Sequence, residues 1–110
     1  MKKVEAIIRT SKFQDVKKAL HDVGVNFFSF WNVTEVENDS DNLTKANSRP
    51  PNDIKCYLSI LVNDDFEDVT IKAILQSAYT GEVGDGRLFV TKIDEVYKIR
   101  TKEQGTITLR

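Results

Sequence analysis

Two stretches of the sequence carry apolar residues at helical spacing, and each lies between short apolar runs typical of β-strands. The first covers residues 12 to 23, with one apolar face formed by Phe13, Val16, Ala19, Leu20 and Val23. The second begins at Asn63-Asp64-Asp65 and ends at Gly81, with a stripe formed by Phe66, Val69, Ala73, Ile74 and Ser77 or Ala78. Such alternation restricts the chain to a mixed α and β fold.

The strand-like runs complete a recognisable order. They cover residues 4–8, 25–36, 54–62 and 87–90, and Val96, Tyr97 and Ile99 extend or follow the last run. The order is β-α-β-β-α-β, which predicts an α+β, ferredoxin-like fold with a four-stranded antiparallel sheet and two helices on one face. With 110 residues, the chain is expected to form a single domain, 1–110.

Helix-start signals precede both helical stretches. Ser11 with Gln14, and Asp64 with Glu67, have the spacing of a capping box. Gly24 stands where the first helix is expected to end.

Two segments are polar and lack a periodic apolar pattern. Residues 37–53 are expected to form a long exposed loop, which in a compact domain is usually functional or disordered. The tail, 101–110, is polar, with an alternating Thr106–Leu109 end that could add a strand.

A glycine-rich turn separates the second helix from the last strand. Gly81, Gly84 and Gly86 fall within six residues, so backbone N–H groups can form a concave anion site suited to phosphate. Arg87 adds a permanent cation at the exit of the turn. The alternative is a plain helix-to-strand turn.

Composition argues against several classes of function. A net charge of −1 and a pI near 5.8 disfavour a nucleic-acid binder, including an RNA-recognition module on this fold. The single cysteine, Cys56, excludes an internal disulfide and fits a reducing cytosol. Lone His21 is expected to face solvent, and no Ser-His-Asp or Cys-His hydrolase arrangement is evident. No apolar run has the length of a membrane span.

Several segments together resemble the PII nitrogen-regulatory signalling family, over nearly the whole chain except the long loop. The matching residues are Met1–Arg9, Lys12, Asp15–Leu20, Thr80–Val90 and Ile99–Thr101. The resemblance implies a homotrimer with nucleotide sites in the clefts between subunits. In that family the glycine turn (the B-loop, 81–87 here) holds phosphates. The long loop (the T-loop, 37–53 here) contacts partner proteins and changes shape with the ligand.

The resemblance also suggests which residues bind the nucleotide. Gly84, Asp85, Gly86 and Arg87 match the family's phosphate-cradling Gly-Asp-Gly-Lys, with Leu88 following. Lys98 and Arg100 match two arginines that reach the phosphates from the neighbouring subunit. Lys55 matches a lysine near the ribose and phosphates, and Ser29 matches a threonine near the adenine. No catalytic residue and no metal ligand is expected.

The sequence also departs from the family pattern. The family's T-loop starts with Gly-Phe-Gly-Arg-Gln, whose glutamine helps to hold Mg-ATP and 2-oxoglutarate, whereas this chain has Val33–Glu37. Ser59 replaces a glutamate that lines the adenine pocket, and the loop lacks the tyrosine that is uridylylated in the family. We therefore expect a divergent PII-like paralogue that binds an adenine nucleotide (ADP, ATP or AMP) but not 2-oxoglutarate. Its need for Mg²⁺ is left open.

The leading hypothesis is a cytoplasmic, trimeric, non-enzymatic regulator of a membrane transporter or an enzyme. It would bind that partner through residues 37–53, without binding nucleic acid or inserting into the membrane. The alternative is a trimeric interaction scaffold with a degenerate site, or one that takes another small effector such as a cyclic dinucleotide or a metal.

Overall fold

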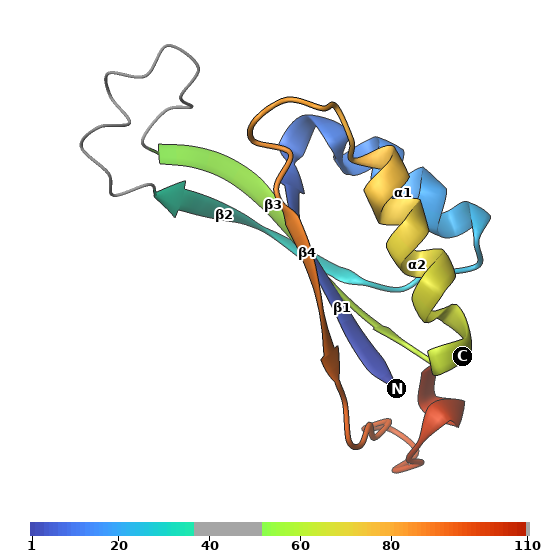
Figure 1. The fold of residues 1–110 in the computed structure, drawn as a ribbon. Coiled ribbons are helices and arrows are strands. Elements are labelled where there is room, and N and C mark those ends of the chain that lie inside the picture. The colour runs from blue at the N-terminus through green and yellow to red at the C-terminus, as the bar shows by residue number, and fades with distance from the viewer. Residues whose placement is uncertain (37–51, 110) are drawn as a thin grey trace.

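The computed structural model describes residues 1–36 and 52–109, with backbone alone at residues 52, 53 and 107 (Figure 1). Its elements are β1 (Lys2–Arg9), the 3-10 turn η1 (Thr10–Lys12), α1 (Phe13–Asp22), β2 (Ser29–Val36), β3 (Asn52–Val62), α2 (Asp64–Ser77), β4 (Arg87–Lys92) and the 3-10 turn η3 (Thr106–Leu109). The predicted β-α-β-β-α-β order is confirmed.

The four strands form one antiparallel sheet in the order β2-β3-β1-β4, which is the ferredoxin-like arrangement. Both helices cover the same face of this sheet (Figure 1). Alternate residues of each strand point toward the helices, so the alternation seen in the sequence becomes the core. The buried apolar side chains are Val4, Ala6, Ile8, Val16, Leu20, Val25, Cys56, Leu58, Ile60, Val62, Ala73, Ile74 and Ala78.

The opposite face of the sheet, here called the open face, carries aromatic residues. The Trp31 and Tyr57 rings stack with centroids 4.5 Å apart, and Phe89 meets Tyr57 edge-on at 6.2 Å. Trp31 is 45% exposed, and Phe89 is 38% exposed. The sheet therefore presents an apolar surface on the side that no helix covers.

The strand boundaries differ from the predicted ones around the second and third strands. β2 starts at Ser29, so residues 25–28 connect α1 to the sheet, and β3 starts at Asn52, two residues earlier than expected. β2 and β3 remain paired from Thr34↔Ile54 to Val36↔Asn52. These pairs lie beyond the end of β1, whose last residue, Arg9, pairs with Lys55. The remainder of the predicted long loop, 37–51, lies outside the described residues.

Both predicted capping boxes are wrong, because neither α1 nor α2 has a side-chain hydrogen bond at its N-cap. At α1, the turn η1 precedes the helix, and the Thr10 hydroxyl donates to the Ile54 carbonyl at 3.1 Å. At α2, Asp64 accepts from the Met1 amino group at 2.9 Å, and Glu67 accepts from Lys2 at 2.8 Å. These acidic residues therefore connect α2 to the start of β1.

The prediction that residues 96–99 extend or follow the last strand as a strand is also wrong. The Lys98 N–H donates to the Glu103 carbonyl at 2.8 Å, and Lys102 donates back to Lys98, so the chain reverses in a tight turn. β4 ends at Lys92 opposite Lys2, where β1 begins, so a longer strand would have no neighbour to pair with. Residues 106–109 form η3 in place of a strand.

Candidate functional site

The glycine turn lies between the end of α2 and the start of β4, as predicted. Its three glycines all have positive φ angles, +87° at Gly81, +107° at Gly84 and +90° at Gly86. Asp85 closes the turn, because its carboxylate accepts from the N–H groups of Thr80 and Gly81, each at 2.9 Å, and from the Thr80 hydroxyl. The turn is therefore an ordered structure with a charged residue at its centre.

Two cations hold this turn from the side of the sheet. Arg9 Nε donates to Asp85 Oδ1 at 3.0 Å, and Arg9 Nη2 donates to the Val83 carbonyl at 2.8 Å. Lys55 Nζ donates to the Gly84 carbonyl at 2.5 Å, and the Lys55 side chain is only 1% exposed. Arg9 and Lys55 are direct partners in the β1–β3 register. Strand pairing thus brings both cations beneath one turn.

The environment of Asp85 keeps its carboxylate charged. Hydrogen bonds from the Thr80 hydroxyl and N–H hold the pKa of Asp85 well below its usual range, with further help from Gly81 and Arg9. The described carboxylate contacts all lie within the turn or on Arg9. Asp85 thus holds the turn in shape while remaining charged.

Arg87 and Leu88 follow the turn and point to opposite faces of the sheet. Arg87 pairs with Ile7 in β1, so it lies on the open face, and it is exposed. Leu88 is half-buried and packs against the core. Arg87 is therefore available to a ligand beside the turn, whereas Leu88 can offer only its backbone.

Three predicted site residues lie away from the turn. Lys98 and Arg100 follow the far end of β4, which is about 17 Å long for six residues. Figure 1 shows the glycine turn at the top of the sheet and the C-terminal segment at the bottom. Ser29 pairs with Ser59, four residues or about 13 Å along β3 from Lys55. Within one chain the structure does not bring these residues to the turn.

Arg9 contacts the glycine turn, although it is not among the nine residues predicted to bind nucleotide. The available signal was its position as a cation directly after the first apolar run, and nothing in the sequence marks Asp85 or Val83 as its partners. The register of β1 against β3 and β4 places it beside the turn, and that register depends on the assembled sheet.

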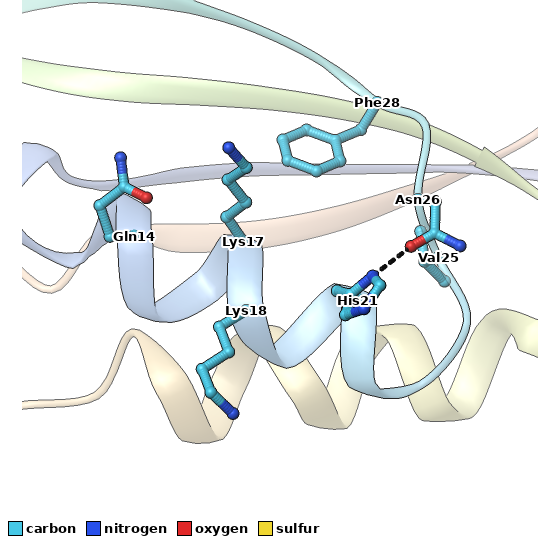
Figure 2. Close-up of a pocket in the computed structure, with 7 residues that line it drawn as sticks. All are labelled: Gln14, Lys17, Lys18, His21, Val25, Asn26 and Phe28. Carbon is cyan, nitrogen blue, oxygen red and sulfur yellow. Dashed lines mark hydrogen bonds between the residues drawn. The ribbon is translucent and has the colours of Figure 1, made fainter.

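A hollow lies between α1 and the segment that leads into β2 (Figure 2). It has a volume of about 320 Å³ and is lined by Gln14, Lys17, Lys18, His21, Val25, Asn26 and Phe28. His21 Nδ1 and Asn26 Oδ1 lie 2.6 Å apart, and Lys18 forms an ion pair with Asp22 at 3.0 Å. As expected, His21 is exposed. None of the predicted site residues lines this hollow, so it is separate from the glycine turn.

Two further observations concern metals and membranes. Within residues 1–36 and 52–109, no three histidine, cysteine, aspartate or glutamate side chains gather as a metal site would require. No helix in the described part of the chain is long and apolar enough to cross a membrane.

Comparison with known proteins relates this architecture to one family. The model of the family "Nitrogen regulatory protein P-II" matches residues 1–103. The chain is 38% identical to nitrogen regulatory protein P-II 2 of Methanothermobacter thermautotrophicus, over 96% of this chain and 94% of that protein. It is 37% identical to nitrogen regulatory protein P-II of Azospirillum brasilense, over 96% of each chain. The chain therefore belongs to the P-II nitrogen regulatory protein family, whose members are signalling regulators and not enzymes.

Proposed function

We propose that this chain is a divergent P-II protein that senses adenine nucleotides. In this proposal three copies form a homotrimer in the cytoplasm and bind ADP, ATP or AMP in the clefts between subunits. Nucleotide binding shifts residues 37–53 between two conformational states. Through these residues the protein binds and regulates a membrane transporter or an enzyme. Of those residues, only the backbone of residues 52 and 53 is described here.

One observation carries the proposal most directly. Arg87 and the positive-φ glycines, with Lys55 buried beneath them, form a cationic cradle at one end of the sheet. Lys98 and Arg100 lie beyond the other end. A single chain cannot direct both groups at one ligand. A neighbouring copy can, by placing its Lys98 and Arg100 over the cradle, so that a polyphosphate meets cations from two subunits.

The open face supports the trimer in this proposal. Trp31, Phe89 and Leu61 are 45%, 38% and 41% exposed, and they lie on the side of the sheet without helices. An apolar face of this kind favours association with another protein surface, and most homo-oligomers close through repeated copies of one interface. The same face from three copies would bury these side chains.

The residues at the base of the long loop limit the set of ligands. Val33 to Val36 form the end of β2 and pair with residues 52–55, and this stretch lacks the glycines and glutamine of the family pattern. The missing glutamine is the side chain that in the family pattern helps to hold 2-oxoglutarate, and Glu35 adds a negative charge there that also disfavours a triphosphate. We therefore propose nucleotide binding without 2-oxoglutarate binding.

Isothermal titration of the protein against ATP, ADP, AMP and cyclic di-AMP tests this function. Each titration is run with and without Mg²⁺ and 2-oxoglutarate. The proposal expects saturable binding of at least one adenine mononucleotide, and no effect of 2-oxoglutarate. Binding of cyclic di-AMP alone would favour a different effector, and absence of any nucleotide binding would favour a scaffold with a degenerate site.

Removing the exposed arginines should weaken nucleotide binding without unfolding the protein. We expect Arg87→Ala and Arg100→Ala each to reduce the binding free energy by about 1–3 kcal/mol, because each loses a charge-assisted hydrogen bond to phosphate. The control is Lys18→Ala, which removes one positive charge from α1 at a distance from the turn. If an arginine variant keeps the affinity of the control, that arginine does not belong to the site.

A further inference from the structure

Arg9 contacts the glycine turn at two places with one side chain. Its Nε donates to Asp85 Oδ1 at 3.0 Å, and its Nη2 donates to the Val83 carbonyl at 2.8 Å. The Arg9 side chain is 28% exposed and that of Asp85 is 25% exposed, so this ion pair is partly withdrawn from water. The planar guanidinium fixes the direction of both bonds, which a lysine ammonium at the same position could not do.

Lys55 completes the grip on the next peptide of the turn. Its ammonium donates to the Gly84 carbonyl, directly after the carbonyl that Arg9 holds. A Cβ built on Gly84 would lie 3.1 Å from Arg9 Nη2 and 3.4 Å from Lys55 Nζ. The backbone at Gly84 therefore passes close to both cations.

Holding these two carbonyl groups fixes the direction of two N–H groups. In a planar trans peptide the C=O and N–H bonds point in opposite directions. Because the carbonyls of Val83 and Gly84 point toward the cations, the N–H groups of Gly84 and Asp85 point away from them. Two successive N–H groups directed to one side form the concave arrangement that binds anions.

Arg9 also compensates the charge of Asp85. That carboxylate stays ionised, since hydrogen bonds from Thr80 hold its pKa well below its usual range. An uncompensated carboxylate in the middle of an anion cradle would repel phosphate. With Arg9 on one carboxylate oxygen, Asp85 can order the turn without adding a net negative charge to it.

We infer that Arg9 is a positioning residue for the glycine turn. It acts through Asp85 and the Val83 carbonyl, and together with Lys55 it orients the N–H groups of the cradle. The inference deepens the proposed function and rests on it in one respect, that the anion in the cradle is the phosphate group of a nucleotide.

Amide hydrogen exchange of the ligand-free protein tests the role of Arg9 in the turn. In Arg9→Gln, the Thr80 and Gly81 amides, which donate to Asp85, should exchange about tenfold faster than in the wild type, while core amides such as that of Leu58 should not change. In Arg9→Lys, the exchange rates of these amides should lie between those of the wild type and those of Arg9→Gln. Lys18→Gln is the charge-matched control and should exchange like the wild type. Unchanged exchange at Thr80 and Gly81 in Arg9→Gln would overturn the inference.

A double-mutant cycle measured with ADP separates positioning from direct phosphate contact. Arg9→Gln should lower the affinity about tenfold. The double variant Arg9→Gln with Asp85→Asn should lose clearly less than the product of the two single losses, because the two residues share one ion pair. Losses that multiply would show that Arg9 affects nucleotide binding independently of Asp85, and would overturn the inference. If the wild type binds no adenine nucleotide, the proposed function fails, while the exchange measurement still decides the role of Arg9.

Discussion

At Gly86 the glycine turn comes closest to the sheet. A Cβ built there would lie 1.7 Å from the Ile7 carbonyl oxygen, and the residue has a φ of +90°. Two independent constraints therefore require glycine at this position, the left-handed backbone and the contact with β1. The contact matters for the site because the neighbouring residues, Asp85 and Arg87, lie on either side of it.

Replacing Gly86 should lower the free energy of unfolding more than replacing a glycine that has a similar φ angle but open surroundings. Gly86→Ala should lower the free energy of unfolding by about 2–5 kcal/mol, from φ strain plus displacement of β1. Gly105→Ala is the control, since its φ is +87° and a Cβ there meets nothing within 4 Å. It should cost only about 1–2 kcal/mol. Urea unfolding measures both, and equal losses would contradict the contact with Ile7.

At the residue scale, the sequence was informative where one residue type signals one property. Three glycines in six residues predicted a turn between the second helix and the last strand, and the structure has this turn, with positive φ angles at Gly81, Gly84 and Gly86. The role of Arg9 could not be predicted, because it depends on a partner 76 residues away that only sheet pairing brings near. The capping box predicted at Asp64 and Glu67 failed for a related reason, since both carboxylates pair with cations at the start of β1.

Among the elements, Tyr57 on the open face links all four strands through one hydrogen bond and two ring contacts. Tyr57 in β3 stacks on Trp31 in β2, meets Phe89 in β4 edge-on and donates its hydroxyl to Glu5 in β1. Glu5 is only 9% exposed and also pairs with Lys3 at 3.3 Å. Tyr57 thus contacts a side chain from each of the other three strands.

The Tyr57 hydroxyl should remain protonated well above the usual pH. Its hydrogen bond to Glu5, with burial and the nearby charge, raises the pKa of Tyr57 to about 12. In the unfolded chain this pKa is about 10. The Tyr57 hydroxyl therefore makes its full contribution to the stability of the folded state below about pH 10, and this contribution is lost as the pH rises toward 12.

Ultraviolet difference titration between the wild type and Tyr57→Phe measures this ionisation. At pH 11, where circular dichroism shows the fold to be retained, Tyr57 should remain mostly protonated, and Glu5→Gln should lower its pKa. The control is Tyr97→Phe, which removes a tyrosine that is 60% exposed. A Tyr57 that is mostly ionised at pH 11 in the folded protein would contradict the described contact.

The order of elements could be predicted because apolar periodicity directly reflects burial on one face. Strand ends could not, because they depend on neighbours: β4 stops at Lys92 where β1 begins, and residues 96–104 turn back on themselves. The alternation around Lys98 and Arg100 looked like a strand, since alternation describes the side chains and not the presence of a pairing partner.

At the scale of the whole molecule, the proposed site is divided between the two ends of the sheet. The glycine turn with Lys55 and Arg87 lies at one end, and Lys98 and Arg100 lie beyond the other. The sequence itself indicated the glycine turn and Arg87 as an anion site, whereas it indicated Lys55, Lys98 and Arg100 only through the resemblance to a family. The geometry of a single chain adds that the two groups can meet only in an assembly of copies.

Mixing two complementary variants tests this division of the site most directly. Arg87→Ala subunits lack the cation beside the turn, and Arg100→Ala subunits lack the cation of the C-terminal segment. Each variant alone should bind ADP weakly. After the two are unfolded together and refolded in equal amounts, every mixed trimer should contain one intact site, so about a quarter of all sites should regain wild-type affinity in a calorimetric titration. A mixture that binds no better than either variant alone would contradict a site shared between subunits.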